Sequence, residues 1–330
     1  MAVGVAVVGL GWWGHKIARE LQTSDLFDVR LGVDPDPDGR DRAEALGIVT
    51  ASTLEAALDA PAVDAVILCS PHRRHVDQMV AAARAGKHVF CEKPFSDRAS
   101  EAERALSALQ EAGVQVGIGH ERRFEPAVLD LRERVRSGDI GTALVFEGNF
   151  SQDKFLALPP DNWRLSLEHA PVGPLSATGI HLVDLAIAVL GTPTSVWANL
   201  STRGTAFENG DTLTVSLQFV DGGSASITAV LTTPFIGRVC VIGSQGWVEI
   251  RDRSHPEAPT GWDVTTSRRD ALPETQFYPP HASVLANLEA FARAVTGEET
   301  YPVTIDEIRA NVRTFEAITR SVTSGAIEPV

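Results

Sequence analysis

The stretch Gly9-Leu10-Gly11-Trp12-Trp13-Gly14 decides the fold of this chain. It follows an apolar, β-rich run, Val3–Val8, and opens a segment with a helical pattern. In a G-x-G-x-x-G loop the first glycine permits a tight turn, the second lets the backbone approach a pyrophosphate, and the third lets helix and strand pack closely. The helix start also offers N–H groups and its dipole to phosphates. We therefore predict a dinucleotide-binding loop to which Leu10, Trp12 and Trp13 contribute.

Asp34 follows the next predicted strand, Val29–Val33, and lies 20 residues after Gly14. An acid at this place accepts hydrogen bonds from the adenosine ribose hydroxyls and repels a 2′-phosphate. Arg40 and Arg42 lie further along the chain. The sequence thus predicts NAD as the cofactor, with NADP disfavoured. The alternative is a loop that binds another phosphate ligand or none.

Up to about residue 120, short β-rich runs alternate with helical patterns such as His75–Gly86 and Ser100–Ala112. This alternation predicts an α/β Rossmann domain, residues 1–122, with a parallel sheet covered by helices. The predicted strands are Val3–Val8, Val29–Val33, Ala65–Cys69, Val89–Phe90 and Val114–Ile118.

Beyond Pro126 a helix at Ala127–Ser137 leads into longer strands, and two helices, Ser283–Val295 and Ile305–Ser324, end the chain. We predict an α+β domain, residues 123–330, with a large open, mainly antiparallel sheet for substrate binding and oligomerisation; its terminal helices could pack back on the first domain. An apolar exposed face of this sheet would favour a homodimer or homotetramer. The predicted strands are Leu144–Phe150, Ser195–Ser201, Thr212–Val220, Ser224–Leu231, Arg238–Ile242 and Trp247–Arg251.

Composition excludes several classes of partner. The 330 residues carry a formal net charge of −14, which leaves no basic field for nucleic acid or anionic lipid. No apolar run is long enough to span a bilayer. The three cysteines are odd in number and widely separated, which favours a reducing, cytoplasmic setting. No H-E-x-x-H motif or Cys/His cluster suggests a metal site.

Two further loops follow strands at the edge where open α/β sheets bind ligands. They are Ser70-Pro71-His72, with His75 one helical turn on, and Glu92-Lys93-Pro94. We predict that these residues contact the cofactor. A solvated surface lysine is the alternative for Lys93.

Here the chain resembles the glucose–fructose oxidoreductase/inositol dehydrogenase (Gfo/Idh/MocA) family over essentially its whole length. The motifs that carry the resemblance are the glycine fingerprint, Glu92-Lys93-Pro94, Arg122-Arg123-Phe124-Glu125-Pro126, Asn162-Trp163-Arg164 and Gly179-Ile180-His181-Leu182-Val183-Asp184-Leu185. The resemblance implies that Lys93 contacts both substrate hydroxyl and cofactor and that His181 accepts and donates the proton. An imidazole suits proton transfer near neutral pH, and an ammonium group stabilises alkoxide character as hydride departs. Without the resemblance, a lone histidine on such a helix is more often a structural residue satisfied by a hydrogen bond.

One position departs from the inositol dehydrogenase pattern, in which an Asp precedes the histidine by one helical turn. Ala177 stands there and carries no carboxylate. Either His181 works without that Asp, or Asp184 partners it from the same helical face. A cap or ion pair is the other reading of Asp184.

Five further residues are candidates for the site. Arg122 is expected to face the cofactor or the domain junction, and an exposed arginine pair is the alternative. Asp153, Lys154, Trp163 and Arg164 fall in a Pro-rich loop that could read a substrate carboxylate or hydroxyl. A Trp–Arg stack that pins the loop explains the last two equally well.

Together these features predict an NAD-dependent oxidoreductase that moves a hydride between nicotinamide and a secondary hydroxyl, or the matching carbonyl, of a sugar, cyclitol or related small polar molecule. Two alternatives remain open: an NAD-dependent glycosidase of the same family, and a non-catalytic sensor that binds the dinucleotide.

Overall fold

A computed structural model describes residues 2–330 and divides the chain into two compact units. Unit 1 combines Met1–Glu121 with Ala282–Val312, and unit 2 combines Arg122–His281 with Arg313–Val330. The long helix α9 (Ile305–Ser324) therefore contributes its first part to unit 1 and its remainder to unit 2.

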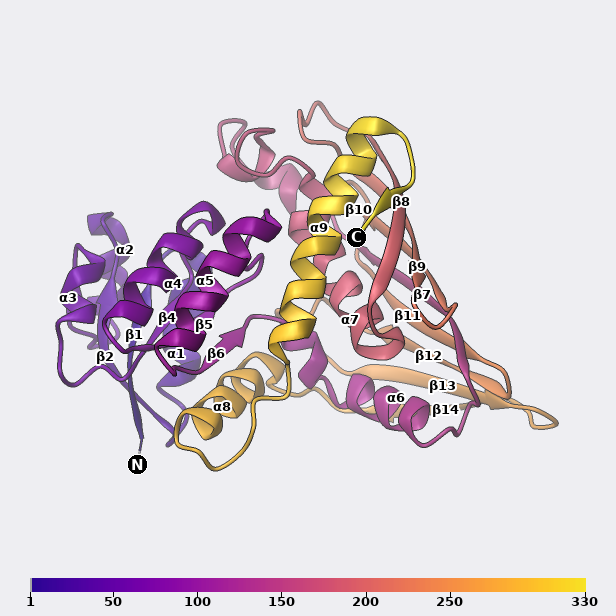
Figure 1. Ribbon diagram of the computed structural model, residues 1–330, viewed down its shortest axis with the longest axis horizontal. Helices are drawn as coiled ribbons and strands as arrows, with labels where there is room; N and C mark the ends of the chain where they lie inside the picture. Colours follow the sequence, from indigo (N-terminus) through magenta and orange to yellow (C-terminus); the bar gives the residue numbers. More distant parts are fainter. Residues whose placement is uncertain (1) are drawn as a thin grey trace. The chain divides into compact units, whose positions relative to one another are not determined.

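Unit 1 is built on a six-stranded parallel sheet with the order β3-β2-β1-β4-β5-β6 (Figure 1). This is the strand order of dinucleotide-binding folds and confirms the predicted Rossmann architecture. Every residue of β1 is buried, as expected for a central strand covered on both faces. The strands are β1 (Val3–Val8), β2 (Phe27–Val33), β3 (Thr50–Ala51), β4 (Ala65–Leu68), β5 (His88–Cys91) and β6 (Val116–Ile118).

Helices connect these strands in the right positions for parallel pairing. Helix α1 packs against α8, and α4 packs against α5. The helices are α1 (Trp12–Leu21), α2 (Pro37–Glu44), α3 (Leu54–Leu58), α4 (His75–Arg84), α5 (Ala99–Glu111) and α8 (Ser283–Val295). Two of them, α2 and α3, were not predicted, because both are short and lack a long apolar stripe.

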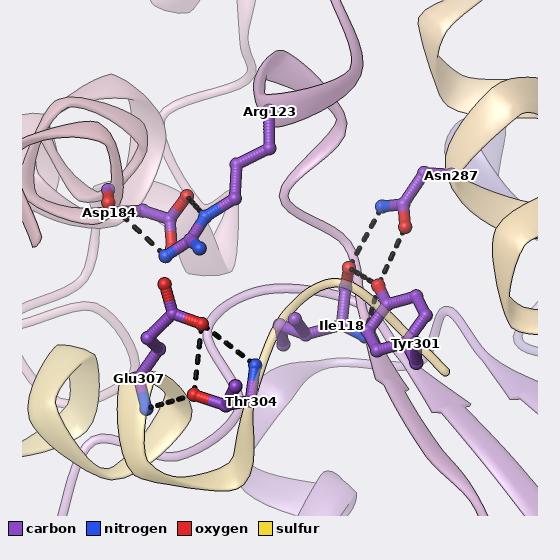
Figure 2. Close-up of polar contacts among 7 residues, drawn as sticks. All are labelled: Ile118, Arg123, Asp184, Asn287, Tyr301, Thr304 and Glu307. Carbon is purple, nitrogen blue, oxygen red and sulfur yellow. Dashed lines mark hydrogen bonds and ion pairs between the residues drawn. The ribbon is translucent and has the colours of Figure 1, made fainter. Parts of the chain in front are cut away.

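A buried hydrogen-bond network fastens the segment after α8 to the edge strand β6 (Figure 2). The Tyr301 hydroxyl accepts from Ile118 N at 3.1 Å, and its one proton has two acceptors in reach, Asn287 Oδ1 at 2.6 Å and Ile118 O at 3.0 Å. Asn287 Nδ2 donates to Ile118 O at 2.9 Å. Thr304 and Glu307 then form a capping box that starts α9.

Unit 2 is built on a nine-stranded sheet with the order β14-β13-β12-β11-β7-β10-β9-β8-β15 (Figure 1). All neighbours are antiparallel except β7 and β10, which confirms the predicted open, mainly antiparallel sheet. Strands β13, β14 and β15 were not predicted from the sequence. The strands are β7 (Ala143–Ser151), β8 (Pro193–Ser201), β9 (Thr212–Phe219), β10 (Ser224–Val230), β11 (Ile236–Gly243), β12 (Gly246–Asp252), β13 (Trp262–Arg268), β14 (Glu274–Tyr278) and β15 (Glu328–Pro329).

One face of this sheet is covered by helices and the other is not. Helix α7 (Ile180–Leu190) contacts β7 and β10, and α6 (Pro126–Arg136) contacts α7 and β12. On the outer face we expected apolar residues, and this expectation was wrong. Arg238 there pairs with Glu147 and Glu249, and Ser and Thr side chains fill much of the rest, with exposed Trp197 and Ile236 among them.

Replacing Tyr301 with Phe should lower the free energy of unfolding by about 1–3 kcal/mol, because Ile118 N and Asn287 would lose a buried partner. Urea denaturation followed by circular dichroism would measure the change. Tyr278→Phe, at a partly exposed phenol, is the matched control and should change stability by less than about 0.5 kcal/mol. Equal effects of the two substitutions would contradict this account.

Candidate functional site

The fingerprint loop depends on two glycines that no other residue could replace without strain. Gly9 has a φ of +91°, and a Cβ there would lie 2.6 Å from Ser70 N. A Cβ on Gly14 would lie only 1.8 Å from Gly9 O. These contacts bring the start of α1 directly onto the end of β1, as the spacing predicts.

The start of α1 is open to a ligand. Gly11 is its N-cap, no side chain caps the helix, and no acidic residue occupies the first turn. A Cβ on Gly11 would meet nothing within 4 Å. Since the first N–H groups of a helix lack intrahelical acceptors, this end suits a pyrophosphate. Trp12, 61% exposed, lies beside it with its ring 5.4 Å from that of Trp13.

Asp34 has a structural role in addition to the predicted ribose contact. Its Oδ2 accepts from Leu10 N at 2.5 Å, and its Oδ1 accepts from Asp36 N at 2.9 Å. Arg42 donates to Leu10 O at 3.2 Å. The end of β2 therefore holds the fingerprint loop in place, and each carboxylate oxygen retains a lone pair for a ribose hydroxyl.

His75 joins the two other loops of this edge. It is fully buried, with Nδ1 2.9 Å from Pro94 O and Nε2 2.8 Å from Ser70 O. Both ring nitrogens thus face backbone carbonyls, and the side chain bridges the loop after β4 and the loop after β5. The sequence had predicted a cofactor contact for this residue. Burial lowers its pKa from 6.5 to about 4, and the neutral ring can donate only one of the two hydrogen bonds. Of its predicted companions, Pro71 is exposed and His72 is buried.

Glu92 is a buried carboxyl group at the end of β5. Burial, followed by the like charge of Glu121, raises its pKa to about 8, against the opposing effects of Trp13 and Lys93. Its Oε2 accepts from Lys93 N at 3.2 Å. A Cβ on Gly119 would lie 2.5 Å from the carboxyl, so this glycine makes room for it. Burial therefore disfavours the ionised form of Glu92, which lies next to a partly exposed Lys93.

In unit 2, His181 lies in the first turn of α7, directly after the π-helical turn Leu175–Gly179. Its side chain is 5% exposed, and its ring lies 5.9 Å from that of Phe150 on β7. Ala177 occupies the preceding turn and is only partly buried. The sequence correctly predicted that His181 lies on a helix. It did not predict that Phe150 of β7 lies beside the histidine ring, which only the fold shows.

Two predicted site residues are engaged in buried ion pairs instead. Arg123 Nε and Nη2 each lie 2.7 Å from the carboxylate of Asp184, so Asp184 forms the ion pair that was one of its two expected roles (Figure 2). Arg122 binds Glu125 and, at 2.8 Å, Asp252. Both arginines are 1% exposed, which corrects the alternative of an exposed pair. Burial raises the pKa of Asp252 although Arg122 opposes the shift.

The loop after β7 is pinned by its own contacts. The guanidinium of Arg164 lies 4.5 Å from the centre of the Trp163 ring, which is the Trp–Arg stack given above as the alternative. Burial lowers the pKa of Arg164. Asn209 Nδ2 donates to Arg164 O at 2.7 Å.

Lys154 pairs with Glu257 and lies 3.1 Å from His255 Nδ1. Its neighbour Asp153 is exposed. No sequence signal pointed to His255 or Glu257, because neither belongs to a motif.

Two negative findings concern residues 2–330. No group of three or more His, Cys, Asp or Glu side chains in this part of the chain is placed to hold a metal ion. No helix among these residues has the length and hydropathy to cross a membrane.

Comparison with known proteins agrees with this geometry. Residues 3–120 match the family model described as "Oxidoreductase family, NAD-binding Rossmann fold", and residues 128–249 match the GFO/IDH/MocA C-terminal domain. The chain belongs to the Gfo/Idh/MocA family. It is thus an oxidoreductase with an NAD-binding Rossmann fold.

Three relatives illustrate the range of this family. The chain is 30% identical to scyllo-inositol 2-dehydrogenase (NAD(+)) from Bacillus subtilis, over 98% of this chain and 95% of that protein. It is 32% identical to D-xylose 1-dehydrogenase (NADP(+)) 2 from Haloferax volcanii, over 86% of each. The structure of aldose–aldose oxidoreductase from Caulobacter crescentus, complexed with glycerol, superposes with a TM-score of 0.89 at 25% identity and covers 100% of both chains.

Replacing Glu121 with Gln removes a negative charge near Glu92 and keeps the side-chain shape. We expect the pKa of Glu92 to fall from about 8 while staying above 4.5, because burial still disfavours the ionised form. A ¹³C NMR titration of the glutamate carboxyls would follow it. Glu111→Gln, at an exposed site on α5, should leave the titration of Glu92 unchanged.

The buried His75 makes stability depend on pH. Between about pH 6.5 and pH 4 the unfolded chain binds a proton at this side chain that the folded chain does not, so the free energy of unfolding falls as pH is lowered through this window. His75→Gln should remove that contribution, and His281→Gln, at an exposed position, should retain it. Denaturant titrations at several pH values measure the slope, and equal slopes in both variants would refute the assignment.

Proposed function

We propose that this protein transfers a hydride between NAD and a secondary hydroxyl, or the matching carbonyl, of a sugar, cyclitol or related small polar molecule. The observation that carries the proposal is the uncapped start of α1 beside Gly11, where a pyrophosphate fits without any side chain to displace. The named activities of the relatives, on scyllo-inositol and D-xylose, support the substrate class. Asp34 at the end of β2 supports NAD over NADP.

The proposed roles of Lys93 and His181 follow from their chemistry. When bound, NAD supplies the carbon that accepts or returns the hydride. His181 takes the proton of the substrate hydroxyl during oxidation and returns it during reduction, as a neutral imidazole can. The ammonium group of Lys93 stabilises negative charge on the same oxygen. Glu92 lies on the same loop as Lys93, and burial raises its pKa to about 8.

We also propose that the cofactor contacts involve the fingerprint loop, Ser70, Pro71 and Glu92, and that Asp153 and Lys154 border the substrate. We further propose that the protein is a homodimer or homotetramer and that it is located in the cytoplasm.

The test is the absorbance of NADH at its long-wavelength band against a panel of sugars, cyclitols and sugar acids. Lys93→Ala and His181→Ala should each lower kcat by about 10²–10⁴-fold and leave NAD affinity largely intact. His281→Ala, at an exposed histidine, is the control and should retain activity. Retained turnover in both site variants would overturn the assigned roles.

Two other outcomes identify the alternatives. Tightly retained cofactor with bond cleavage but no net NADH formation would indicate a glycosidase. NAD binding without turnover across the whole panel would indicate a sensor.

A further inference from the structure

Gln152 is a buried carboxamide whose oxygen has no protein partner. Its side chain lies at the end of β7, and the residue is 6% exposed. Its backbone N–H donates to Val230 O at 2.8 Å, which continues the ladder between β7 and β10 by one residue. Its Oε1 is buried and accepts no hydrogen bond from any side chain or backbone group in residues 2–330. A buried amide oxygen in this state costs stability unless a ligand or water satisfies it.

The strand places this amide on the face that carries His181. Alternate residues of β7 point to one side of the sheet, and Phe146, Gly148 and Phe150 are all buried there. A Cβ on Gly148 would lie 3.0 Å from Leu182 of α7, and the Phe150 ring lies 5.9 Å from the His181 ring. Gln152 is the next residue of this series.

The order of these contacts runs toward the beginning of α7. Gly148 meets Leu182, Phe150 meets His181, and β7 also contacts the preceding turn, Leu175–Gly179. Gln152 therefore comes level with that turn, where Ala177 offers only a methyl group.

We propose that Gln152 binds a hydroxyl group of the substrate, with its carboxamide oxygen accepting the hydroxyl proton in a hydrogen bond. This inference rests on the proposed function and adds a specificity residue to it. A carboxamide is neutral and does not take up a proton, so Gln152 orients the substrate and leaves the proton transfer to His181.

Gln152→Leu tests the proposal because binding and stability should respond in opposite directions. Leucine is similar in size and has no polar atom, so the melting temperature should stay equal or rise once the unsatisfied oxygen is gone. The KM for the best polyol should rise about 10-fold, which corresponds to the loss of one hydrogen bond to substrate. The Kd for NAD should be unchanged. Gln218→Leu, at an exposed carboxamide on β9, is the matched control and should alter neither constant.

Three results are distinguishable. If wild-type protein turns over a polyol and Gln152→Leu has the same KM with a lower melting temperature, the oxygen holds an ordered water only, and the proposal is wrong while the proposed function stands. If the wild type turns over no polyol, the proposed function fails, and the inference about Gln152 is then tested by the binding of a polyol. In that case, a polyol that raises the melting temperature of the NADH-bound wild type but not of NADH-bound Gln152→Leu supports it, and equal or absent shifts overturn it.

Discussion

The contact between Gly14 and Gly9 O is the constraint on which the nucleotide-binding edge depends. Because no side chain intervenes, the first turn of α1 sits against the end of β1 and its N–H groups point out of the loop. Asp34 then fixes Leu10 from the neighbouring strand. The loop is thus shaped before any cofactor arrives, so binding need not order it.

In the remaining loops of unit 1, buried side chains likewise hold the backbone in place. His75 spans from Ser70 O to Pro94 O, and the peptide after Lys93 is therefore tied to the loop after β4. Glu92 fills the space that Gly119 leaves. Burial disfavours the charged form of both groups: it lowers the pKa of His75 to about 4 and raises the pKa of Glu92 to about 8.

Unit 2 uses its buried charges differently. Arg122 pairs with Glu125 and Asp252, and Arg123 pairs with Asp184. These pairs fix the start of the unit relative to α7 and β12, and removal of one partner would leave a buried charge uncompensated. Around His181, by contrast, the neighbours are the aromatic ring of Phe150 and, further along the strand, the unsatisfied oxygen of Gln152.

The sequence by itself determined the Rossmann fold, the NAD-binding loop and the helix that carries His181, because glycine spacing and apolar periodicity are local properties of the chain. It predicted most strands of the second sheet but not β13 or β14, because a polar residue, Thr266, stands at a buried position of β13 and most residues of β14 are exposed. Only the tertiary structure decided that Arg122, Asp184 and His75 serve buried ion pairs and a bridge between loops, since their partners Asp252, Arg123 and Pro94 lie 130, 61 and 19 residues away. The same holds for Gln152: no motif marks it, and only the fold shows that its side-chain oxygen is buried without a hydrogen-bond donor among residues 2–330.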